Sequence, residues 1–299
     1  MRIVLAYTHH PRCIAHYYRR AFQQLGHEVV TVGPWADEWP MGTDGREPNI
    51  QLHRFLYSHY LYDMLPLAVR RHDLFILIDS GEKLTIQTIP GKWAHLALEG
   101  TSLEWSDTPY KFAGLMQHVK HPEGVTWSPG AFDVEEHLPG PPASERQFDL
   151  VQMAIPYESR KFMAVHVPQI APDLRCKFGE VWGPEYGDTY RNALATWVGS
   201  GQDFVTIRVF EAMAMGCLVI ADRTPSIAKL FNEDEHFIGY DPLWNQHGEP
   251  YPNPTWLVET IRRIRRDGDG GMAARAQALV WSRDSWKHRA QAILDRVAQ

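Results

Sequence analysis

The sequence has few cysteines, and its formal net charge is not positive. Its 299 residues include three cysteines, Cys13, Cys176 and Cys217, which lie far apart and form no CxxC pair. A disulfide framework and a zinc site are therefore not expected, and a reducing, cytoplasmic setting is the natural one. The net charge of −6 gives no general attraction to nucleic acid or anionic lipid, although a local basic patch is still open.

Long apolar runs are also missing. The N-terminal run, Ile3–Tyr7, has five residues, which is too short for a signal peptide or a membrane span, and no later run is long enough to cross a bilayer. Because 44% of the residues are hydrophobic and 12% are aromatic, the chain can still bury a sizeable core. Its length suits one large domain or two of ordinary size.

What the sequence does contain is a repeated alternation of strand and helix patterns. In the first half we expect strands at 2–7, 27–33, 73–79, 94–100 and 124–130, and helices at 13–26 and 52–71, the second interrupted by Pro66. The alternation restarts at residue 148 and ends in three helices, at 256–266, 272–281 and 285–299. Such a pattern predicts the α/β class, with open parallel sheets and right-handed crossovers.

Proline marks the division of the chain. The stretch 137–147 holds three prolines and a glycine, so it is the best linker candidate. We expect two doubly wound, Rossmann-like domains facing across a crevice, and a ligand at the carboxyl ends of their strands. The expected boundaries are an N-terminal domain, 1–140, a linker, 141–147, a C-terminal domain, 148–284, and a C-terminal helix, 285–299, that could pack back on the N-terminal domain.

The segment 203–216, "DFVTIRVFEAMAMG", carries charges inside an amphipathic helix pattern. Arg208 and Glu211 lie one turn apart, and Asp203 precedes the first turn. One interpretation is that Arg208 pairs with Glu211 while Asp203 caps the helix. The other is a ligand site, because a helix N-terminus suits a phosphate and a carboxylate can accept hydrogen bonds from a diol.

This segment resembles the nucleotide-sugar-binding signature of glycosyltransferases with the GT-B fold. In their group 1 family an acidic residue, seven intervening residues and a Glu open an "EAMA-x-G-x-P-V-I" run, and Asp203 and Glu211 match that spacing. An "R-x-F-E" core, matched by Arg208, Phe210 and Glu211, is similar to the branch of spore-maturation-type enzymes. The resemblance implies a glycosyltransferase, in particular a hexosyltransferase.

Two further segments resemble the same family. "SPGAFDVEEHLP" (128–139) is similar to the "P-G-V-D-x-x-x-F-x-P" segment that leads into the C-terminal domain, and "AIPYESRKF" (154–162) to a stretch that supplies basic residues to the diphosphate. The resemblance covers residues 128–299, while the N-terminal half matches only in architecture. The first domain would then present the acceptor and the second would bind the nucleotide sugar.

The resemblance implies roles for the donor site. Glu211 would hold the ribose hydroxyls, and Asp203 would lie near the hydroxyls of the sugar, although it is one methylene shorter than the usual Glu. Arg160, with Lys161, and Arg208 would neutralise the diphosphate. The loop around Trp182, Gly183 and Tyr186 would meet the base, and Phe204 and Thr206 are further donor-binding candidates.

Three residues at the ends of predicted strands are candidates for catalysis. His10 follows the first strand in "THHP" and could be a general base, or a loop histidine without that role. Asp79 and Glu99 also end strands, and each could take a proton or cap a turn. The loop "THHPRC" lacks the glycines that many members of the family carry there.

Other features leave alternatives open. "RRIRR" (262–266) is either a solvated helix face or a patch for an anionic acceptor, such as phage DNA with hydroxymethylated bases. Asp267 and Asp269 fit a turn between helices, so no metal and no cofactor beyond the donor are expected, with a UDP-sugar favoured and a GDP-sugar as the alternative. The rival functions are a sugar-nucleotide epimerase of the same fold and a non-catalytic nucleotide-binding protein.

Overall fold

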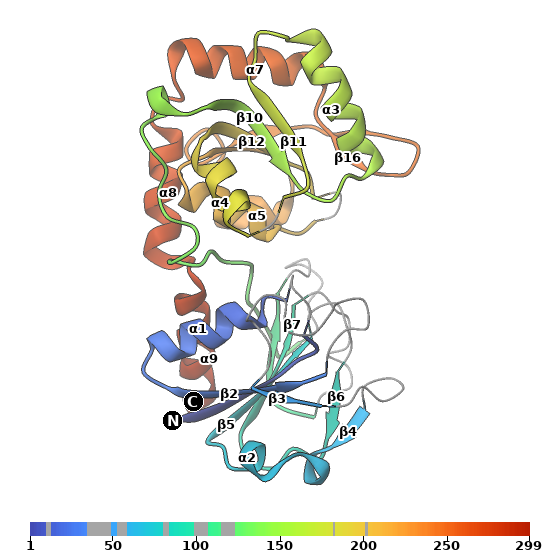
Figure 1. Ribbon diagram of the computed structural model, residues 1–299, viewed down its shortest axis with the longest axis vertical. Helices are drawn as coiled ribbons and strands as arrows, with labels where there is room; N and C mark the ends of the chain where they lie inside the picture. The colour runs from blue at the N-terminus through green and yellow to red at the C-terminus, as the bar shows by residue number, and fades with distance from the viewer. Residues whose placement is uncertain are drawn as a thin grey trace. The chain divides into compact units, whose positions relative to one another are not determined.

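The computed structural model describes residues 1–9, 13–34, 49–52, 59–79, 84–98, 107–114, 123–181, 183–200 and 203–299. The chain forms two compact units. Unit 1 combines Met1–Pro129 with Trp286–Gln299, and unit 2 is Gly130–Ser285 (Figure 1).

Unit 1 is built on a parallel sheet whose strand order changes direction between β1 and β5. Both strands are near-continuous apolar runs, as expected for strands buried on both faces. In spatial order the sheet contains β3 (Ile50–Gln51), β2 (Glu28–Gly33), β1 (Arg2–Ala6), β5 (Leu74–Asp79), β7 (Trp93–Ala97), β8 (Tyr110–Ala113) and β9 (Val125–Trp127).

Helices α1 (Ala15–Gln24) and α9 (Trp286–Ala298) pack together in unit 1 (Figure 1). The ring of Tyr18 on α1 meets the ring of Trp286 on α9 edge-on, with centroids 5.1 Å apart, and both side chains are buried. The last helix of the chain therefore completes the core of the unit that contains the first strand.

The helix expected at 52–71 is wrong for residues 59–70. This segment forms a short strand, β4 (His59–Leu61), a 3₁₀ turn, η2 (Tyr62–Met64), and one helical turn, α2 (Leu67–Arg70), while β4 pairs with β6 (Thr85–Gln87). Tyr60 and Tyr62 are buried and Leu61 is 48% exposed, so the burial follows the alternation of a strand. Pro66, which has no N–H to donate, stands at the N-cap of α2, so the helical turn begins only after it.

Unit 2 is built on a second parallel sheet. In spatial order it contains β11 (Cys176–Gly179), β10 (Phe148–Met153), β12 (Ala193–Val198), β13 (Leu218–Asp222) and β14 (Ile238–Tyr240). The chain starts at β10, adds β11 on one side and then builds outward on the other. The order therefore reverses between β10 and β12, which makes their carboxyl ends the expected place for a ligand.

Helices cover both faces of this sheet (Figure 1). Leu218 and Ile220 of β13 pack in one core cluster with α3 (Glu158–Ile170) and α7 (Pro254–Asp267). Val219 and Ala221 point the other way, into a cluster with α5 (Ile207–Ala214) and α8 (Met272–Arg283). Unit 2 also contains α4 (Pro184–Arg191), α6 (Pro225–Leu230), η5 (Ala143–Glu145) and a hairpin of β15 (Leu243–Trp244) and β16 (Pro250–Tyr251).

The predicted α/β class with parallel sheets is confirmed by these strand orders. The proline-rich segment 141–147 lies within unit 2, whose first residue is Gly130. Gly140 donates its N–H to the carbonyl of Met215 at 3.0 Å. The guanidinium of Arg146 binds the carbonyls of Ala193 and Gly216, so this segment is fastened to the core of unit 2.

Candidate functional site

A cavity of about 210 Å³ lies at the point of unit 2 where the strand order reverses. The loop after β10 leads through Tyr157 into α3, and the loop after β12 contains Gly199 and Ser200. The hairpin β15–β16 supplies the third wall. The residues that line the cavity are Tyr157, Ser159, Arg160, Trp197, Gly199, Ser200, Gly248, Glu249 and Pro250.

Two arginines bring positive charge to this place. Arg160 lines the cavity, donates from Nη1 to the carbonyl of Ile155 at 2.7 Å and lies over the ring of Tyr157. Burial, and less strongly the nearby charge of Arg208, lower the pKa of Arg160 to about 10. Arg208 forms no hydrogen bond or ion pair with any described residue. The positive charges of the two guanidinium groups repel each other, and an anionic ligand would relieve this repulsion.

Glu211 is buried beside these arginines, with 7% of its surface exposed. Its Oε2 accepts a hydrogen bond from the hydroxyl of Tyr186 at 2.5 Å, and its Oε1 lies 3.4 Å from Nε2 of His137. Burial raises the pKa of Tyr186 well above its usual value, the charge of Glu211 raises it further, and Arg208 opposes both. The Arg208–Glu211 ion pair that the spacing allowed is not among the contacts of the described residues.

His137 is not among the site residues that the sequence predicts. Its ring is buried, and Nδ1 accepts the backbone N–H of Asp133 at 2.9 Å. One signal could have identified it: in the segment 128–139, His137 stands where the pattern "P-G-V-D-x-x-x-F-x-P" has a phenylalanine. A polar ring in place of an apolar one next to a proposed binding segment is a reason to look for a polar partner.

Asp203 has a partner on a neighbouring element. Its Oδ1 accepts the backbone N–H of Ser226 at 2.8 Å, near the start of α6, and Ser226 Oγ donates to the carbonyl of Asp203 at 3.0 Å. The interpretation that Asp203 caps its own helix is corrected by these contacts. That helix, α5, begins at Ile207 after its N-cap residue Thr206, and the side chain of Thr206 makes no capping hydrogen bond. Its first N–H groups therefore receive no side-chain hydrogen bond at the N-cap.

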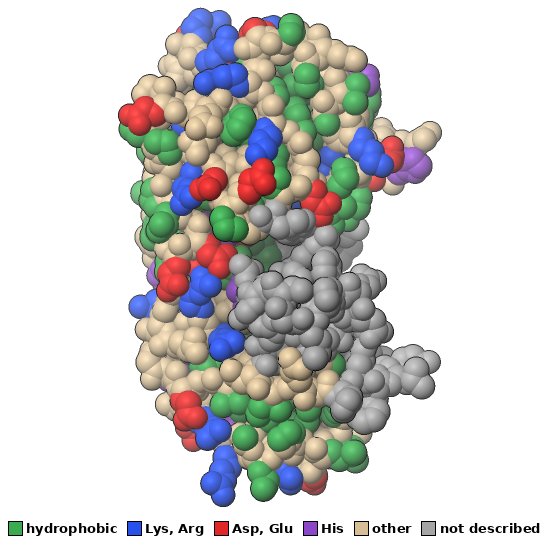
Figure 2. Space-filling model, in the orientation of Figure 1, with side chains coloured by type: hydrophobic (Ala, Val, Ile, Leu, Met, Phe, Trp, Pro, Cys, Tyr) green, Lys and Arg blue, Asp and Glu red, His purple; other side chains and the backbone are tan. Residues whose placement is uncertain are grey.

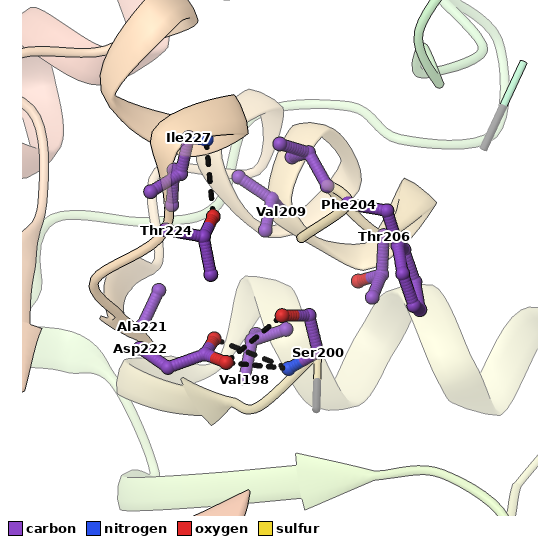
Figure 3. A pocket seen from close by; sticks show the side chains of 10 residues that line it. Val198, Ser200, Phe204, Thr206, Val209, Ala221, Asp222, Thr224 and Ile227 are labelled. Atoms are coloured by element: carbon purple, nitrogen blue, oxygen red, sulfur yellow. Dashed lines mark hydrogen bonds between the residues drawn. The ribbon is translucent and has the colours of Figure 1, made fainter. Parts of the chain in front are cut away.

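Phe204 and Thr206 border a second, smaller cavity of about 10 Å³ (Figure 3). On its far side the carboxylate of Asp222 accepts hydrogen bonds from the backbone N–H and the hydroxyl of Ser200. These bonds fix the loop after β12, which also lines the larger cavity. The hydroxyl oxygen of Thr206 is buried and has no hydrogen-bond partner among the described residues.

The start of α3 is occupied by a carboxylate from the hairpin. Glu249 Oε2 accepts the backbone N–H of Ser159 at 2.7 Å and the amide of Asn245 at 2.9 Å. Burial alone would raise the pKa of Glu249, but these hydrogen bonds outweigh it, so the pKa is lowered. The hairpin thus places a negative charge at the helix N-terminus, where the helix dipole favours it.

The remaining predicted donor-site residues are on the surface of unit 2 or outside the described residues. Lys161 is exposed and pairs with Glu158 at 2.7 Å on the surface of α3. Gly183 is the N-cap of α4, with a φ of 63° that favours glycine, and is exposed. Trp182 lies outside the described residues.

Of the three catalytic candidates, the structure describes Asp79. It ends β5 in unit 1, where the strand order of that sheet reverses, and it is buried, with its carbonyl accepting the N–H of Leu98. His10 and Glu99, which follow β1 and β7, lie outside the described residues.

The carboxylates and arginines near the end of α7 have local partners. Asp269 accepts the N–H groups of Gly271 and Ala273, which makes the predicted turn between α7 and α8. Arg262 and Arg265 bind Asp173 at 2.5 Å and 3.4 Å. On the face in Figure 2, basic and acidic side chains are both spread over unit 2.

The described residues contain no group of three or more His, Cys, Asp or Glu residues arranged to hold a metal ion. Within the same residues, every helix is too short or too polar to span a lipid bilayer.

Residues 174–295 match a family model described as glycosyl transferase-like, and no curated protein matches the chain. Several solved structures are similar over the whole chain. Sucrose-phosphate synthase from Thermosynechococcus elongatus is 13% identical with a TM-score of 0.59, over 100% of this chain and 98% of that one. HepE from Anabaena in complex with UDP and glucose is 11% identical with a TM-score of 0.65, over 100% and 99%. A glycosyltransferase from Rickettsia africae is 9% identical with a TM-score of 0.63, over 99% and 97%.

At these identities the solved structures show the fold, and the family match adds the glycosyl transferase-like character of the C-terminal part. The chain therefore has the GT-B fold, its residues 174–295 are glycosyl transferase-like, and together these findings support a transferase.

Proposed function

We propose that this protein transfers a sugar from a nucleoside diphosphate sugar to an acceptor hydroxyl. The observation that carries the proposal is the grouping of Arg160, Arg208 and Glu211 at the strand-order reversal of unit 2. Two close guanidinium groups suit a diphosphate, which can accept hydrogen bonds from both. A buried carboxylate one helical turn from Arg208 suits the two hydroxyls of a ribose.

The chemistry follows from charge. When the bond between the sugar and the diphosphate breaks, negative charge develops on the leaving phosphate. Arg160 and Arg208 would stabilise that charge, together with the first backbone N–H groups of α5, which receive no capping hydrogen bond from the side chain of Thr206. These groups are in place before the reaction, so little reorganisation is needed when the charge appears.

For the donor we favour a UDP-sugar, with a GDP-sugar as the alternative, and a hexose as the group transferred. HepE, which shares the fold, was solved with UDP, with UDP and glucose, and with UDP-glucose. The "R-x-F-E" core formed by Arg208, Phe210 and Glu211 places the chain nearest the spore-maturation-type branch in this proposal.

We also propose that the transfer is metal-independent, because the two arginines supply the positive charge that a divalent cation would otherwise bring to the diphosphate. Full activity in the presence of EDTA is the expected result. Restoration of lost activity by Mg²⁺ or Mn²⁺ would refute this part.

His10, Asp79 and Glu99 are the proposed candidates for the group that takes the proton of the acceptor. Each is replaced in turn, by His10→Ala, Asp79→Asn and Glu99→Gln. Replacement of the residue that acts as base should lower kcat strongly, while the affinity for UDP stays unchanged.

The central experiment is calorimetric titration of UDP and GDP into the wild type and Glu211→Ala. Glu211→Ala should weaken the binding of the preferred nucleotide strongly, whereas Glu158→Ala, which removes an exposed carboxylate on α3, should not. Equal affinities in the wild type and Glu211→Ala would refute the site.

Turnover separates the proposed transferase from its rivals. A transferase releases free nucleoside diphosphate only with an acceptor or slowly to water, whereas an epimerase alters the sugar nucleotide without an acceptor. A binding protein would turn over nothing across an acceptor panel that includes hydroxymethylated duplex DNA. Salt-sensitive gel shifts of that DNA would favour the nucleic-acid acceptor.

A further inference from the structure

Glu211 lies between two side chains that contact different oxygens of its carboxylate. The hydroxyl of Tyr186 binds Oε2, and the ring of His137 faces Oε1 at 3.4 Å. An ionised carboxylate has about four acceptor sites, so two donors leave room for a further pair. The two protein contacts therefore determine which lone pairs of Glu211 are left for a ligand.

The hydrogen bond on the far side of the ring determines which nitrogen of His137 carries the proton. The backbone N–H of Asp133 points at Nδ1 with a distance of 2.9 Å, so Nδ1 must accept. In a neutral imidazole the proton then resides on Nε2, which is the nitrogen facing Glu211. His137 is thereby set up as a donor to the carboxylate.

The turn that carries His137 is itself held firmly. Asp133 Oδ1 accepts the backbone N–H groups of Glu135 and Glu136 at 2.9 and 3.0 Å, and the N–H of His137 donates to the carbonyl of Asp133 at 2.9 Å. Just before the turn, Phe132 is fully buried, with its ring centroid 4.8 Å from that of Trp281 on α8. The imidazole has little freedom to follow a moving carboxylate, so it fixes the carboxylate instead.

We propose that His137 is a positioning residue for nucleotide recognition: it orients Glu211 so that the unused lone pairs of the carboxylate receive the ribose diol. This inference rests on the proposed function, because it assigns a second residue to the site in which Glu211 binds ribose. His137 acts through Glu211 and touches no reacting atom.

The test compares nucleotides with and without the diol. UDP, GDP and their 2′,3′-dideoxy forms are titrated by calorimetry into the wild type, His137→Phe and His137→Gln. Phe keeps a ring of similar size without a donor, and Gln keeps an N–H donor. His166→Phe is the matched control, because His166 lies on α3 and its Nδ1 contacts the carbonyl of Phe162.

We expect His137→Phe to lose the discrimination between ribonucleotides and dideoxynucleotides. For His137→Phe the affinity for the preferred ribonucleotide falls on the order of tenfold, as for the loss of a hydrogen bond to a charged group, while the affinity for the dideoxy form changes little. His137→Gln restores most of the preference for the diol, and His166→Phe behaves as the wild type. Should His137→Phe fail to fold, His137→Asn, which is too short to reach Glu211, replaces it.

Each contrary outcome has a separate meaning. An unchanged ratio between ribonucleotide and dideoxynucleotide in His137→Phe refutes the inference, including the case in which both affinities fall together. A wild type that binds both forms equally refutes the role of Glu211 toward ribose, and the inference with it, while donor binding stands. A wild type that binds neither UDP nor GDP refutes the proposed function itself.

Discussion

The carboxylate of Asp203 accepts the backbone N–H of Ser226 at 2.8 Å and so caps α6, a helix other than the one that follows it in sequence. Thr224 caps the same helix through the N–H of Ile227 at 3.2 Å (Figure 3). In the motif spacing Asp203 occupies the position expected near the sugar of the donor. Its engagement with α6 indicates a structural role.

Replacing Asp203 should therefore affect stability more than binding. Asp203→Ala is expected to lower the free energy of unfolding by about 1 kcal/mol, the usual cost of losing a helix cap, while Asp203→Asn keeps the acceptor and stays close to the wild type. Urea denaturation measures the first effect, and UDP titration should show a change of less than about twofold. A variant of normal stability that has lost the preference for UDP-glucose over UDP would instead place Asp203 against the sugar.

The repulsion between Arg160 and Arg208 predicts that removing one charge weakens nucleotide binding without lowering the stability of the fold. Arg208→Gln should weaken UDP binding about tenfold or more, because a charge-assisted contact with phosphate is lost. The same change should leave stability equal or slightly higher, since the charge that lowers the pKa of Arg160 is gone. Arg296→Gln is the control, because Arg296 is exposed on α9 in unit 1, where it donates to Gln299. A marked loss of stability in Arg208→Gln would show a structural role for Arg208.

The layers of both units were predictable because their signal is local. Strand β5 is six buried residues in a row, and β13 is five, and a run of that kind between helical patterns indicates a parallel sheet covered on both faces. The helix prediction for residues 59–70 was wrong for the opposite reason. Apolar residues there fit a helical period, yet the pairing of β4 with β6 decides its structure, and no local pattern shows that partner.

The candidate site was also predictable only in part. Spacing within a helix shows that Arg208 and Glu211 are neighbours, but not that Glu211 takes its hydrogen bond from Tyr186 on α4. The contact with His137 depends on a turn from before β10, and Asp203 reaches a helix after β13. Such partners are set by the tertiary fold, so a single sequence identifies the charged residues without showing what they touch.

The burial of His95 leads us to expect that the chain loses stability at acidic pH. His95 lies on β7, is 5% exposed, and its ring nitrogens have no hydrogen-bond partner among the described residues. Burial, and less strongly the charge of Lys111, lower the pKa of His95 to about 4. The unfolded chain protonates this residue near pH 6.5, whereas the folded chain does so only near pH 4. Stability is therefore lost as pH falls through that interval.

The total loss in the free energy of unfolding is about 3 kcal/mol, because each pKa unit corresponds to about 1.4 kcal/mol. His95→Leu, which is neutral at every pH, should remove this part of the pH dependence. Urea denaturation of both proteins between pH 7.5 and 4 gives the measurement. The two stability curves should diverge below about pH 6.5, and parallel curves would show that the native His95 titrates normally.

The last prediction concerns Arg146, which holds the proline-rich segment to unit 2. Its Nε donates to the carbonyl of Pro141 at 3.1 Å, and its Nη1 donates to the carbonyls of Ala193 and Gly216, each at 2.6 Å. Burial lowers the pKa of this guanidinium. Arg146→Met should cost about 2 to 4 kcal/mol, because three carbonyls lose a charged donor.

Arg146→Lys tests whether geometry or charge matters. A lysine keeps the charge but has no planar fork, so one ammonium cannot reach three carbonyls that approach from different elements. We therefore expect Arg146→Lys to be nearly as unstable as Arg146→Met in urea denaturation. Stability close to the wild type would mean that the positive charge suffices. Because the segment leads from the turn that bears His137 into β10, both variants should also weaken UDP binding under conditions in which the chain is still folded.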